Sequence, residues 1–127
     1  MLILFVDDDI EEFDIFCEGL KAYRPATKCM HVLNGLEAFK LLKAGLTLWP
    51  DYIFLDINMP LMGGKEFLQK VKLIPKLRDI PVIVYSTSSN PLEIQTFKKL
   101  GADDFVVKPA SFKDLINILR RIIPQNV

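Results

Sequence analysis

The chain has 127 residues, which is the length of one ordinary domain and leaves no room for a second. Half of the residues are apolar and a quarter are charged, so the chain can bury a core and is not expected to be disordered. Sixteen basic and sixteen acidic residues give a formal net charge of zero, which argues against a nucleic-acid binder because such proteins need a basic surplus. The first apolar run, Met1 to Val6, is far shorter than the roughly 20 residues that span a bilayer.

The two cysteines, Cys17 and Cys29, lie inside apolar stretches and have no metal-like spacing with the single histidine, His31. We interpret them as buried free thiols of a protein that works in the reducing cytoplasm. A disulfide or a metal site at these residues is the less favoured alternative.

The first half of the chain alternates short apolar runs with helical patterns. The strand Leu2–Val6 precedes a helix over Ile10–Tyr23, which Pro25 ends. The apolar stripe of this helix consists of Ile10, Phe13, Phe16, Cys17 and Leu20. The next predicted elements are a strand, a helix, a strand and a helix, at Lys28–Val32, around Leu36–Lys43, at Tyr52–Leu55 and around Lys65–Leu73.

The second half continues the same alternation. The strand Val82–Tyr85 precedes a helix that starts near Pro91 and ends at Gly101. The strand Phe105–Val107 then leads to a last helix with Ser111 as its N-cap. The apolar positions of this helix are Phe112, Leu115, Ile116, Leu119, Ile122 and Ile123.

Five strands alternating with five helices predict an α/β fold with a doubly wound, five-stranded parallel sheet. The first, third and fourth strands are apolar on both faces, which is typical of parallel strands covered by helices above and below. In a flavodoxin-like sheet with strand order 2-1-3-4-5, the ligand crevice lies at the carboxyl ends of strands one and three. We therefore look for function just after Val6 and just after Leu55.

Carboxylates follow both of these strands. Asp7, Asp8 and Asp9 come directly after the first strand and Asp56 comes directly after the third, while Asp9 is best interpreted as the N-cap of the first helix. Taken singly, the other three could be ordinary loop residues. Together they would repel one another by about 4 kcal/mol per pair at about 4 Å and an effective dielectric of about 20. Such a cluster raises carboxylate pKa values or recruits a cation, and oxygen ligands in a wet crevice favour Mg²⁺ over Ca²⁺.

The ends of strands four and five carry hydroxyls and a lysine. Ser86 could donate to an anion beside Asp56, whereas Ser88 and Ser89 are interpreted as turn and helix-capping residues. Lys108 could offset the acidic charge and hold an anionic oxygen, with a solvated lysine as the alternative. His31 is more plausible as a residue inside a strand than as a catalyst.

Four segments, each at the end of a predicted strand, follow one another along the chain: Val6–Asp8, Asp51–Gly64, Pro81–Ser86 and Gly101–Pro109. Together they resemble the receiver domain of two-component response regulators, and the resemblance covers essentially the whole chain. We therefore expect a single receiver domain over residues 1–127 without an effector domain. The sequence departs from the family at three positions. Ser86 stands where the family often has threonine, Thr87 stands where it usually has alanine, and Ala110 stands where it often has a bulky residue.

The resemblance implies a role for each residue at the strand ends. Asp56 would be the phosphoacceptor, and Mg²⁺ would be held by Asp7, Asp8, Asp56 and the backbone carbonyl of Asn58. Lys108 would contact the phosphoryl group, Ser86 would be the switch hydroxyl, and Phe105 would be the switch aromatic residue that turns inward when Ser86 moves.

The expected function is phosphorylation by a histidine kinase or a histidine phosphotransfer protein, followed by binding of a downstream protein. The binding face would comprise the fourth helix, the fifth strand and the fifth helix, and the chain would not be an enzyme beyond its own phosphorylation and dephosphorylation. Ile15 lies off the apolar stripe and is either a phosphodonor contact or an ordinary exposed residue. The alternatives are a Mg²⁺-dependent phosphohydrolase with Asp56 as nucleophile and a flavin-binding electron carrier, which the acidic crevice disfavours.

Overall fold

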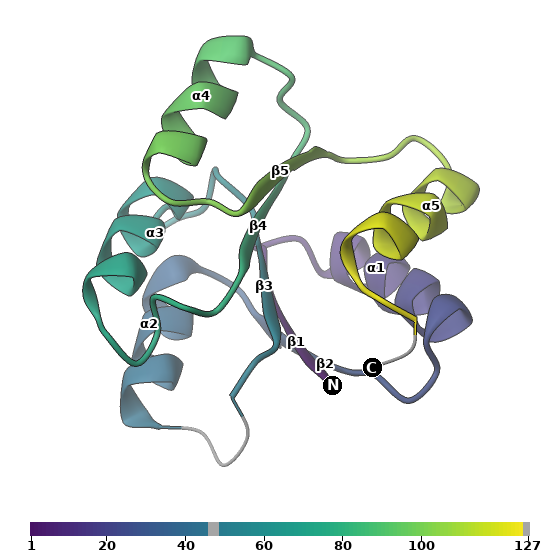
Figure 1. The fold of residues 1–127 in the computed structure, drawn as a ribbon, viewed down its shortest axis with the longest axis horizontal. Helices are drawn as coiled ribbons and strands as arrows, with labels where there is room; N and C mark the ends of the chain where they lie inside the picture. The colour runs from purple at the N-terminus through teal and green to yellow at the C-terminus, as the bar shows by residue number, and fades with distance from the viewer. Residues whose placement is uncertain (46–48, 126–127) are drawn as a thin grey trace.

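The computed structural model describes residues 1–45 and 49–125, in which a parallel sheet lies between two layers of helices (Figure 1). The strands pair in the order β2-β1-β3-β4-β5, and every pairing is parallel. Helices α1 and α5 cover one face of the sheet, and α2, α3 and α4 cover the other (Figure 1). The elements are β1 Leu2–Val6, α1 Ile10–Tyr23, β2 Lys28–Val32, α2 Gly35–Ala44, β3 Tyr52–Leu55, α3 Gly64–Leu73, β4 Val82–Ser86, α4 Pro91–Lys99, β5 Asp104–Val107 and α5 Phe112–Ile122. The predicted flavodoxin-like fold is confirmed.

The helix starts follow from local hydrogen bonds. Asp9 caps α1 by accepting from the backbone N–H groups of Glu11 and Glu12, and Ser111 caps α5, as predicted. The cap of α4 is Asn90, whose side chain accepts from the N–H of Leu92. The capping role predicted for Ser88 and Ser89 is therefore wrong, whereas the turn role predicted for Ser88 is confirmed, because its Oγ accepts from the Asn90 N–H at 3.3 Å.

Two apolar clusters hold the sheet between its helices. On the side of α1 and α5 the cluster is rich in aromatic rings, with the Phe16 ring centroid 4.6 Å from Phe5 and 4.8 Å from Phe54. Gly19 lies where α1 packs on α5, and a Cβ atom there would lie 2.6 Å from the Leu115 side chain, which would have to shift. The second cluster, on the other side, is mainly aliphatic and includes residues of β1, β3 and β4. Burial on both faces explains why the central strands are apolar throughout.

Two apolar residues are less buried than the helical spacing predicts. Ile10 is 61 % exposed, and Phe112 is also exposed, so neither belongs to the buried stripe of its helix. Each is the first residue of its helix, α1 or α5. Cys17 and Cys29 are free but only half-buried, and burial raises the pKa of both thiols. Within the described residues, no helix is long and apolar enough to cross a membrane.

Candidate phosphoacceptor site

The carboxylates predicted to meet do lie at one edge of the sheet. Strands β1 and β3 are neighbours in register, with Val6 opposite Leu55, so the residues that follow them emerge side by side. The N–H of Asp56 donates to the carbonyl of Val6 at 2.9 Å, which extends the pairing by one step. Asp7, Asp8 and Asp56 each offer an oxygen within 4.8 Å of the others. Three hard oxygen donors so close together suit a divalent cation such as Mg²⁺.

Asp7 is the most firmly held of the three. Its side chain is only 2 % exposed. One carboxylate oxygen, Oδ1, accepts from the Asp9 N–H at 2.9 Å, and the other, Oδ2, accepts from Lys108 Nζ at 3.1 Å. Its backbone N–H donates to the Val32 carbonyl at 3.1 Å, and its own carbonyl lies 2.8 Å from His31 Nε2. A buried carboxylate needs such partners, because an unpaired charge away from water is costly.

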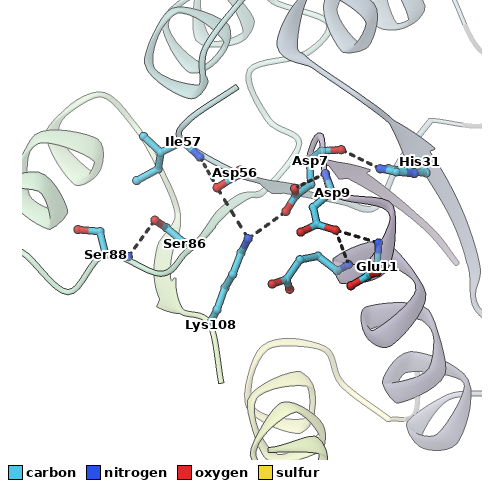
Figure 2. Close-up of polar contacts among 10 residues, drawn as sticks. Asp7, Asp9, Glu11, His31, Asp56, Ile57, Ser86, Ser88 and Lys108 are labelled. Carbon is cyan, nitrogen blue, oxygen red and sulfur yellow. Dashed lines mark hydrogen bonds and ion pairs between the residues drawn. The ribbon is translucent and has the colours of Figure 1, made fainter. Parts of the chain in front are cut away.

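Lys108 places one ammonium between two acidic residues. Its Nζ lies 3.1 Å from Asp7 Oδ2 and 3.9 Å from Asp56 Oδ1, and Figure 2 shows the side chain reaching up between them. Burial acts to lower the pKa of Lys108, but Asp56 and Asp7 outweigh it and the net pKa is raised. Lys108 is therefore a permanent cation at this site, as its position after β5 predicted.

Asp56 is the carboxylate with the strongest electrostatic perturbation. Burial raises its pKa from 3.8 to about 6, Lys108 and the Ile57 N–H act against this rise, and the charges of Asp7 and Asp8 add to it. Three carboxylates face a single ammonium, so the site is short of positive charge. A cation would relieve that deficit, which is the physical reason for regarding the cluster as a metal site.

The three consecutive aspartates have distinct environments. Asp7 is buried and immobilised, Asp8 is exposed beside it, and Asp9 caps α1 with hydrogen bonds of 2.9 and 3.3 Å to the N–H groups of Glu11 and Glu12. Only Asp7 and Asp8 contribute to the cluster with Asp56. The sequence separated these roles correctly, since it assigned Asp9 to the helix.

Ser86 is the last residue of β4 and lies at the neighbouring strand end. Its side chain is buried, and its Oγ accepts from the Ser88 N–H at 3.1 Å, as Figure 2 shows. Its carbonyl accepts from the Lys108 N–H at 2.7 Å, which ties the ends of β4 and β5 together. Asn58 is exposed in the loop after Asp56, and Thr87 and Ala110 are exposed at the rim.

The side chain of Phe105 already points into the protein. It is 9 % exposed, and its ring packs edge-on against Phe97 of α4 at a centroid distance of 6.2 Å. The resemblance implies that Phe105 turns inward when Ser86 moves; in this structure the ring is already inward while Ser86 bonds Ser88, so the coupling of the two movements stays a prediction. An aromatic ring without a hydroxyl gains nothing from facing water, and the space beside Phe97 accommodates it.

Two residues near the site were not singled out for it by sequence. Tyr85 lies beside Lys108, whose Nζ is 5.8 Å from the ring centroid, and burial raises the pKa of its phenol. His31 belongs to β2, as predicted, but its ring reaches Asp7. Sequence patterns do not show this contact, because it depends on strand register: in the structure Phe5 pairs with His31, so Asp7, two positions after Phe5 on the same face, is within reach of the ring.

The fold and the site together define a class of protein. Its members are doubly wound α/β domains with an acidic crevice and one lysine at the carboxyl ends of the strands, where the strand order of the sheet reverses. The chain belongs to the response regulator receiver family, since the family model described as "Response regulator receiver domain" matches residues 3–120. Receiver domains are in general signalling modules rather than enzymes.

Known relatives agree with this assignment. The chain is 33 % identical over 122 residues to the "Two-component response regulator ORR11" of Oryza sativa, which covers 96 % of this chain and 80 % of that protein. It resembles the phosphorylated cyanobacterial phytochrome response regulator RcpA with a TM-score of 0.85 and 30 % identity, covering 95 % of this chain and 89 % of that one. The Mn²⁺-bound form of response regulator Rcp1 superposes with a TM-score of 0.83 at 29 % identity, covering 95 % and 90 %.

Proposed function

We propose that Asp56 accepts a phosphoryl group from a histidine kinase or a histidine phosphotransfer protein and that the phosphorylated chain signals by binding another protein. The observation that carries the proposal is the set of three carboxylates within 4.8 Å of one another, with the Lys108 ammonium between two of them. Mg²⁺ would be held by Asp7, Asp8, Asp56 and the backbone carbonyl of Asn58. When bound, it supplies positive charge that offsets the charge on the phosphoryl oxygens.

The proposed reaction is a transfer between nitrogen and oxygen. A carboxylate oxygen of Asp56 attacks the phosphorus of the donor's phosphohistidine, an O–P bond forms, and the P–N bond breaks as the imidazole leaves. The Oδ1 atom of Asp56 already accepts from the Ile57 N–H at 2.9 Å, so we assign the attack to Oδ2. The Lys108 ammonium is near enough to hold an anionic phosphoryl oxygen once the group has been transferred.

The signal would leave through the face formed by α4, β5 and α5. Ser86 gains an acceptor when Asp56 carries a phosphoryl group, and its Oγ would then exchange its bond with Ser88 for one with the phosphoryl oxygens. Three apolar residues on or beside these elements are exposed and available to a downstream protein: Leu92, Val107 and Phe112. We propose that the protein works in the cytoplasm. We also propose that residues 1–127 form one receiver domain.

A phosphorylation assay distinguishes this function from the alternatives. Incubation with Mg²⁺ and acetyl phosphate should add one acid-stable, base-labile phosphoryl group per chain, and the Asp56→Asn variant should not acquire it. Steady turnover of a phosphomonoester would instead support a phosphohydrolase, and a yellow protein would support a flavin carrier. The hydrolase is not favoured, because Asn58 stands two residues after Asp56, where it cannot serve as a general acid.

A further inference from the structure

His31 connects the second strand to the acidic loop. Strand β2 lies beside β1, with His31 opposite Phe5, so the imidazole lies on the same face of the sheet as Phe5 and Asp7. Its Nε2 is 2.8 Å from the carbonyl oxygen of Asp7, the contact drawn at the right of Figure 2. A carbonyl oxygen only accepts hydrogen bonds, so this contact requires a proton on Nε2.

Aromatic packing fixes the orientation of the His31 ring. The ring stacks on Phe13 of α1 with a centroid distance of 4.3 Å and an interplanar angle of 11°. Phe5 approaches it at 6.1 Å and 55°. The half-buried imidazole is thus held between β1 and α1, with its Nε2 directed at the loop that joins these two elements.

The held carbonyl belongs to the peptide group that joins Asp7 to Asp8. Asp7 has other anchors, since Asp9 and Lys108 bond its carboxylate. Asp8 is exposed, and within residues 1–45 and 49–125 its carboxylate makes no hydrogen bond. The direction in which Asp8 presents its oxygen therefore depends on its backbone, which begins at the peptide group bonded by His31.

We propose that His31 is a positioning residue that acts through the Asp7–Asp8 peptide to orient the two carboxylates toward the cation. The inference rests on the proposed function of the site as a divalent metal centre. His31 touches neither the cation nor the phosphoryl group. Residues that orient metal ligands in this indirect way typically change metal affinity by 10–100-fold when replaced, and a contact to the backbone belongs near the lower limit.

The test compares Mg²⁺ and Mn²⁺ affinity in His31→Phe, His31→Gln and His31→Met, measured by isothermal titration calorimetry. Phenylalanine keeps the stacking on Phe13 and removes the donor, so we expect its affinity to fall about 10-fold. Glutamine and methionine have similar size and flexibility, but only glutamine donates, so glutamine should bind more tightly than methionine. Met30→Leu, on the opposite face of the same strand, should leave the affinity unchanged.

A second measurement needs no metal. The amide nitrogen of Asp8 belongs to the peptide group whose carbonyl His31 bonds, so its NMR chemical shift should move in His31→Phe and His31→Met. In His31→Gln it should stay near the wild-type value. A loss of packing would instead move the shifts of Phe5 and Phe13 in His31→Gln and His31→Met, which lack a ring to stack on Phe13, and leave those of His31→Phe near the wild-type values.

The outcomes separate the two proposals. If the wild-type chain binds neither Mg²⁺ nor Mn²⁺, the proposed metal centre fails. If the wild type binds them and His31→Phe binds equally well, the positioning role is overturned while the proposed function stands. Should His31→Phe fail to fold, equal affinities and equal Asp8 shifts in the glutamine and methionine variants would overturn it.

Discussion

The carboxylate of Asp56 should lower the stability of the metal-free protein at neutral pH. Its pKa is raised from 3.8 to about 6, chiefly by burial, and only 13 % of its side chain is exposed. Because the folded state binds this proton more tightly than the unfolded state, stability falls as pH rises from about 4 to about 6. A shift of about two units corresponds to about 3 kcal/mol, and the whole penalty is present above pH 6.

Asp56→Asn removes this penalty because asparagine has no proton to lose. We therefore expect the variant's free energy of unfolding, relative to wild type, to rise by up to about 3 kcal/mol between pH 4 and pH 8. The comparison across pH cancels any fixed change in packing. Urea unfolding without divalent ions at four or five pH values measures both proteins.

The control for this experiment is the exposed residue Asp79. The Asp79→Asn variant should differ from wild type by no more than about 0.5 kcal/mol at every pH. A flat difference for Asp56→Asn over the same range would refute the electrostatic reasoning. Addition of Mg²⁺ should then stabilise the wild type at pH 7 and leave Asp56→Asn nearly unchanged.

Three further substitutions test the site and its surroundings. Lys108→Met leaves Asp7 buried without its counter-charge and should lower the free energy of unfolding by about 3 kcal/mol at pH 7. Urea unfolding measures this loss, and a loss below about 1 kcal/mol would contradict the pairing. Leu61 is exposed with a φ of 67°, so Leu61→Gly should raise stability by up to about 1 kcal/mol in the same assay, whereas a loss would show that its side chain contributes contacts. Ile15 is 53 % exposed on α1. Ile15→Asp should slow phosphotransfer from the donor protein but not from acetyl phosphate, and it should leave the melting temperature unchanged. Equal rates of transfer from the donor protein to the variant and to the wild type would rule out a contact between Ile15 and the donor.

Sequence reasoning located the acidic site because parallel sheets restrict where function can lie. Continuous apolar runs define buried parallel strands, and the residue after each strand must emerge at the same edge. Asp7, Asp56 and Lys108 were found in this way, and the structure brings them together. Asp9 was separated from them because N-caps have a recognisable place in the sequence.

Other features depend on distances that a periodic pattern does not contain. Helical spacing assigns Ile10 and Phe112 to a face, but it does not reveal that the first residue of each helix is left exposed. The inward position of Phe105 depends on the space beside Phe97, which belongs to a different element. Long-range contacts of this kind depend on how the elements pack together. A single sequence shows which residues are present but not how far apart they lie in the folded protein.

Lys108 also links the two states of the proposed switch. In this structure its Nζ is closer to Asp7, at 3.1 Å, than to Asp56, at 3.9 Å. A phosphoryl group on Asp56 would add roughly −1.5 to −2 charges and so compete with Asp7 for the ammonium. Asp7 would keep its position if Lys108 moved toward Asp56, because its second oxygen stays bonded to the Asp9 N–H and its backbone stays bonded to Val32 and His31. The contacts that hold Asp7 in place therefore leave Lys108 available to respond to the charge on Asp56.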